Sequence, residues 1–102
     1  MHIIPLDATN WTSILDFFDA VLPAIGAPAG HGHSVDALID SMIWGGMNAL
    51  EPPYTVRISG TGEAPENVRD KIELVKQALA EARAEFRARQ GHDVEVQLET
   101  YP

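Results

Sequence analysis

Hydrophobic residues along the chain alternate between two spacings. In "YTVRIS" (54–59) and "DVEVQLET" (93–100) every second residue is apolar, which predicts strands with one solvated face. The short apolar run "HIIPL" (2–6) predicts another strand, and Pro5 indicates a sheet edge or the end of a strand. Apolar residues at helical spacing predict helices over residues 14–25, 35–42 and 65–90. The predicted element order is β-α-α-β-α-β.

Polar and glycine residues mark the ends of these helices. Ser13 and Asp16 have the spacing of a capping box at the first helix, and Ser34 is placed to cap the second. Gly91 follows the long third helix and is suited to end it. The inner stripe of this third helix is predicted to be Val68, Ile72, Val75, Leu79, Ala82 and Phe86.

The order of elements predicts an α/β fold. Strands joined by helical crossovers run parallel, and right-handed connections place the helices on one side of the sheet. Strands buried on both faces would be apolar throughout, whereas the second and third strands alternate. We therefore predict one domain, residues 1–102, with two layers: a three-stranded parallel sheet and helices packed on one face.

Charge is distributed unevenly along the chain. The net charge is −8, yet all seven lysines and arginines lie after position 56. The first 56 residues carry six acids and no lysine or arginine, a field that repels nucleic acid and anionic lipid and favours a basic partner. The chain has no cysteine, no basic leader segment and no apolar run of membrane-spanning length, so we expect a cytoplasmic protein that does not bind membranes.

Motifs for cofactors and catalysis are weak. Gly60 and Gly62 in "SGTGEAP" lack the remainder of a nucleotide-binding fingerprint, so a plain turn is the better interpretation. His31 and His33 in "HGH", with Asp36 nearby, are ligand types that Zn²⁺ accepts, but a fourth ligand is not evident. No serine lies in a nucleophile-elbow motif. We expect no metal, no cofactor and no enzymatic activity.

Asp36 and Asp40 are a more informative pair. Positions i and i+4 of a helix share one face, so their mutual repulsion costs on the order of 0.2 to 0.5 kcal/mol. The helix dipole offsets part of this cost for Asp36, which lies in the first turn, but not for Asp40. Two interpretations remain open from the residues alone, a solvated helix face or a pair of carboxylates with a general acid and base role.

The stretch around these aspartates resembles the barstar family of intracellular ribonuclease inhibitors. The similarity lies in "HGHSVDALIDSM" (31–42), where a glycine precedes a capped helix with the pattern Asp-Ala-Leu-x-Asp. The proline-led strand "PPYTVRI" follows, and the order of elements over nearly the whole chain is similar as well.

This resemblance implies that an acidic surface blocks the basic active site of a ribonuclease. Asp36 and Asp40 match the two helix acids that occupy phosphate subsites of the enzyme, and Gly32 matches the glycine of the loop. Three positions depart from the family: His31 stands where an aromatic residue covers the active-site mouth, Ile39 where the helix carries tryptophan, and Phe86 where a late helix carries an acid. The resulting partner-binding residues are His31, Gly32, His33, Ser34, Asp36, Ile39, Asp40 and Trp44.

The sequence therefore predicts a non-enzymatic inhibitor or immunity-type protein, monomeric when free, that binds a basic ribonuclease or related toxin. One alternative is an adaptor with the same fold and no nuclease partner, whose surface includes Trp44 and Met47. The other is a small carboxylate- or metal-dependent enzyme that uses Asp36, Asp40 and His33.

Overall fold

The computed structural model describes residues 2–45 and 47–102 and contains the predicted strands and helices in the predicted order. A single-turn 3-10 helix, η1, lies between the second strand and the third helix. The elements are β1 (His2–Asp7), α1 (Ile14–Ala24), α2 (Val35–Ile43), β2 (Tyr54–Ser59), η1 (Thr61–Glu63), α3 (Glu66–Gln90) and β3 (Val96–Thr100).

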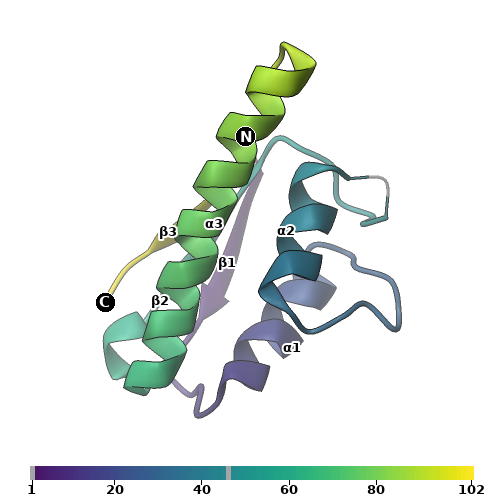
Figure 1. Ribbon diagram of the computed structural model, residues 1–102. Coiled ribbons are helices and arrows are strands. Elements are labelled where there is room, and N and C mark those ends of the chain that lie inside the picture. Colours follow the sequence, from purple (N-terminus) through teal and green to yellow (C-terminus); the bar gives the residue numbers. More distant parts are fainter. Residues whose placement is uncertain (1, 46) are drawn as a thin grey trace.

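The three strands form one parallel sheet in the order β1-β2-β3, as predicted. The register pairs Ile4 with Val56 and Val56 with Leu98, so these apolar side chains share one face of the sheet. The helices cover that side, with the long α3 in front of the sheet and running roughly along β1 (Figure 1). Because β1 is an edge strand, Pro5 is tolerated within it.

The core lies between the sheet and the helices. Phe17 and Val21 of α1 and Leu38 of α2 are completely buried. The inner stripe of α3 is buried at Val68, Ile72, Val75 and Leu79, while Ala82 and Phe86 lie partly exposed beyond it. The C-terminal end of α3 therefore extends past the main core, where it lies beside α2.

The other face of the sheet is mostly solvated, with one exception. Arg57 pairs with Glu99 at 3.2 Å, and the Tyr101 hydroxyl donates to the same carboxylate at 3.1 Å. Thr55, which the alternating pattern placed on the wet face, is only 2% exposed. Thr55 belongs to the central strand and lies in register between Ile3 and Gln97, so both neighbouring strands shield it.

The predicted helix ends are found with small shifts. The Asp16 carboxylate accepts hydrogen bonds from the backbone N–H groups of Thr12 (2.8 Å) and Ser13 (3.1 Å), which lower the pKa of Asp16. Gly91 ends α3 in the left-handed conformation, with φ of 77°. Pro65 is the residue before α3 rather than part of its first turn. In the described part of the chain, no helix is long and apolar enough to cross a bilayer.

Candidate functional site

The N-terminus of α2 fixes the position of the two aspartates. The Ser34 hydroxyl accepts a hydrogen bond from the backbone N–H of Ala37 at 3.1 Å, which confirms Ser34 as the cap of this helix. Asp36 lies in the first turn and Asp40 one turn later. The cap sets where the helix begins, and the helix then aligns the two carboxylates on one face.

These carboxylates line a groove of about 290 Å³ between α2 and α3, which we call the acidic groove. Its lining residues are Asp36, Ile39, Asp40, Trp44, Ala78, Glu81, Ala82 and Glu85. The two alanines have short side chains, so the space beside them stays open. Of the predicted partner-binding residues, Asp36, Ile39, Asp40 and Trp44 are thus brought together.

The acidic groove holds four carboxylates and little positive charge. Glu85 pairs with Arg89 one turn later at 2.8 Å. Among the described residues, Asp36, Asp40 and Glu81 have neither an ion pair nor a side-chain hydrogen bond. Four like charges around one hollow repel one another and favour a cationic ligand.

Sequence reasoning missed the contribution of α3 to this groove. Neither Glu81 nor Glu85 was among the residues predicted to bind the partner. Ala78, Glu81, Ala82 and Glu85 are spaced as one face of a helix, and this was the available signal. Only the packing of α2 against α3 shows that this face meets the aspartates of the other helix.

His31 is directed into the protein rather than toward solvent. Its side chain is buried, Nδ1 lies 2.8 Å from the Gly32 carbonyl oxygen, and Nε2 lies 3.0 Å from the Ser41 hydroxyl. Because a carbonyl only accepts, Nδ1 carries a proton in this arrangement. The Ser41 hydroxyl also lies 3.0 Å from the Leu38 carbonyl oxygen, and its single proton serves either that carbonyl or His31 Nε2. His31 therefore fastens the loop before α2 to the C-terminal half of that helix.

His33 points to a different part of the molecule. Its Nε2 lies 3.7 Å from the Asp19 carboxylate, and its ring contacts Phe18 edge-on with centroids 5.8 Å apart. Both contacts belong to α1, whereas Asp36 and Asp40 line the groove between α2 and α3. The structure thus separates His33 from the carboxylates of the proposed enzyme site. Within the described residues, no cluster of three or more histidine or acidic side chains has the arrangement of a metal site.

Trp44 forms one end of the acidic groove. It is 45% exposed, and its ring contacts Phe86 of α3 edge-on at a centroid distance of 5.0 Å. Phe86 in turn contacts the His92 ring at 5.4 Å. Phe86 is thus the middle member of an aromatic row that begins at the groove and continues toward the start of β3.

Comparison with known proteins agrees with the fold. A family model described as "Barstar (barnase inhibitor)" matches residues 1–99. No curated protein matches the chain.

Proposed function

We propose that this chain, which belongs to the barstar family, inhibits a basic ribonuclease or a related basic toxin through the acidic groove. The observation that carries the proposal is the convergence of Asp36, Asp40, Glu81 and Glu85 on one hollow. Among the described residues, Arg89 is the one lysine or arginine that pairs with any of these four carboxylates. Carboxylates fixed on two packed helices replace the phosphates of a nucleic acid substrate. Arginine, lysine and histidine side chains of the enzyme supply the missing positive charge.

The surface differs from the one inferred from sequence in how the loop takes part. The exposed Ser34 caps α2, and the buried His31 ties the loop to Ser41. Gly32 accepts the second hydrogen bond of His31. In this proposal these residues position the carboxylates, while Asp36, Asp40, Ile39 and Trp44 contact the partner.

Inhibition assays with cationic ribonucleases from the same genome test the proposal. Wild type and Asp36→Asn/Asp40→Asn are titrated against each enzyme with a fluorogenic RNA substrate. Truncating one partner of a buried, hydrogen-bonded charge pair costs about 2 to 5 kcal/mol, so we expect the double variant to lose roughly 30-fold or more in affinity. Association should also slow as salt is raised.

The matched control is Glu73→Gln, which neutralises an exposed acid of α3 outside the acidic groove. Its affinity should equal that of wild type. If wild type inhibits none of the enzymes, or the double variant inhibits as well as wild type, the proposed function is wrong.

An adaptor role without a nuclease partner is the second candidate. It is favoured by the exposure of two large apolar side chains, Trp44 at 45% and Met47 at 51%. An adaptor that binds through these residues would retain its partner in about 0.5 M salt, whereas an electrostatic inhibitor would associate more slowly and weakly there. Trp44→Ala/Met47→Ala would abolish adaptor binding, and Asp36→Asn/Asp40→Asn would not.

A further inference from the structure

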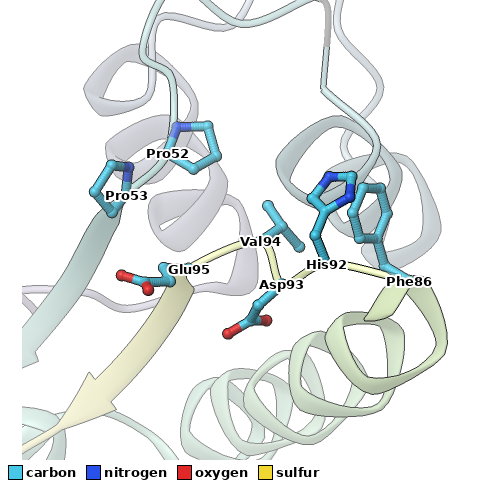
Figure 2. Close-up of a pocket in the computed structure, with 7 residues that line it drawn as sticks. All are labelled: Pro52, Pro53, Phe86, His92, Asp93, Val94 and Glu95. Carbon is cyan, nitrogen blue, oxygen red and sulfur yellow. The ribbon is translucent and has the colours of Figure 1, made fainter. Parts of the chain in front are cut away.

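A second hollow lies beyond the aromatic row, and the acidic groove does not include it. It has a volume of about 370 Å³, and Figure 2 shows the side chains around it. We call it the proline pocket, and its lining residues are Pro52, Pro53, Phe86, His92, Asp93, Val94 and Glu95. Phe86 lines this pocket and also contacts Trp44 of the acidic groove, so the two hollows are neighbours on one surface.

The walls of the proline pocket are flat, apolar and held in place. The rings of Pro52 and Pro53, joined by a cis peptide bond, form one side, and the Phe86 ring with that of His92 forms another (Figure 2). Asp93 accepts two hydrogen bonds from the Arg83 guanidinium, at 2.9 and 2.6 Å. This ion pair ties the segment before β3 to α3, so the pocket does not depend on a mobile loop for its shape.

One acid at the pocket remains available to a ligand. The carboxylate of Asp93 is occupied by Arg83, while Glu95 has no ion pair or side-chain hydrogen bond among the described residues. Arg83 is close enough to Glu95 for that acid to contribute to its raised pKa, but Asp93 is its direct partner. Figure 2 places the Glu95 carboxylate and the Phe86 ring on opposite sides of Val94.

We infer that the proline pocket receives one arginine side chain of the basic partner, which spans the pocket with its aliphatic stem against Phe86 and its guanidinium paired with Glu95. Arginine fits because its long aliphatic stem packs against aromatic and proline rings, and the planar guanidinium at its end has donors that match a carboxylate. Lysine lacks the planar group, and an acidic side chain would be repelled by Glu95 and by a net charge of −8.

This inference rests on the proposed function, because it gives the same partner a second anchor next to the acidic groove. Its test uses no ribonuclease, so a failure of the arginine site can be distinguished from a failure of the proposed ribonuclease inhibition. N-acetyl-arginine amide is titrated into ¹⁵N-labelled protein, with N-acetyl-citrulline amide as the uncharged isostere. The corresponding lysine and phenylalanine amides are titrated in the same way.

We expect the arginine amide to shift the signals of Phe86 and of residues 92–95, with a dissociation constant on the order of 10 mM. The citrulline and lysine amides should bind at least roughly threefold more weakly, because one lacks the charge and the other the planar group. Glu95→Gln should lower the affinity for the arginine amide by a similar factor. Glu81→Gln, which neutralises an acid of the acidic groove, should leave the pocket shifts unchanged.

The inference is overturned if arginine amide leaves residues 92–95 unshifted, or if citrulline binds equally well. Stronger binding by the phenylalanine amide would also overturn it and assign the pocket to an aromatic side chain. Preserved amide spectra of Glu95→Gln and Glu81→Gln verify that both variants are folded.

Discussion

Neutralising one carboxylate on each wall of the acidic groove should stabilise the isolated protein. Asp36 with Asp40 and Glu81 with Glu85 are like-charge pairs one helical turn apart, and each such pair costs about 0.2 to 0.5 kcal/mol. Asp40→Asn/Glu81→Gln removes both pairs, so the free energy of unfolding should rise by roughly 0.4 to 1 kcal/mol. For a chain of this size that corresponds to an increase in Tm of roughly 2 to 8 °C.

Urea denaturation and thermal melts measure this gain. The measurement is made in about 10 mM salt, where charges interact over about 30 Å, and again in about 1 M salt, where the screening length is about 3 Å. The gain should be largest in low salt and should shrink strongly in high salt. The same variant should bind a basic partner more weakly, because it lacks two of the carboxylates that favour cations.

Glu73→Gln is again the matched control, because Arg69 and Lys76 lie four and three residues away on the same helix. The stability of Glu73→Gln should stay the same or fall slightly, because the substitution removes favourable charge interactions with Arg69 and Lys76. The reasoning is refuted if the double variant is less stable than wild type in low salt. It is refuted as well if the gain is independent of salt.

Three further predictions concern the parts of the fold that hold the site. Ser41→Ala leaves the buried His31 ring without one partner, so the protein should lose about 1 to 3 kcal/mol in urea denaturation, and an unchanged stability would show that this bond is unimportant. The guanidinium paired with Asp93 lowers the pKa of that acid to about 2, below its unfolded value of 3.8, so its stabilising effect is present above about pH 4 and is lost as the pH falls through about 2. Asp93→Asn should therefore be less stable than wild type at neutral pH, and the two denaturation curves should converge near pH 2; a constant difference would contradict this assignment. Gly26 has φ of +70°, and a Cβ added there would lie 2.6 Å from the Cβ of Ala49, so Gly26→Ala should lower the free energy of unfolding by about 2 to 5 kcal/mol. Gly30→Ala should cost less, because φ is +86° there but the space around the added Cβ is open. Equal losses of stability in the two variants would refute the steric argument.

Much of the fold could be predicted from the sequence because its signals are local. The alternation in residues 54–59 gives β2 with the bounds that the structure shows. Ser34, Asp16 and Gly91 mark helix ends through hydrogen bonds and backbone angles within a few residues of themselves. The parallel sheet follows because a helix between two strands returns the chain to the same end of the sheet.

Part of the candidate site was also determined locally. Asp36 and Asp40 share a face because both belong to one helix, and the distribution of lysine and arginine along the chain already predicted a basic partner. Ile39 and Trp44 follow the same helical spacing, and the structure places both at the groove.

The tertiary structure alone decided which distant residues join these aspartates. Glu81 and Glu85 are separated from Asp40 by more than forty residues, and only the packing of α2 against α3 brings them to one hollow. The inward turn of His31 likewise depends on Ser41, which the helix presents ten residues later. Spacing along one helix is fixed by its own geometry, whereas a contact between elements depends on how each buries its apolar face. The first can be predicted from the order of residues, and the second requires the packed molecule.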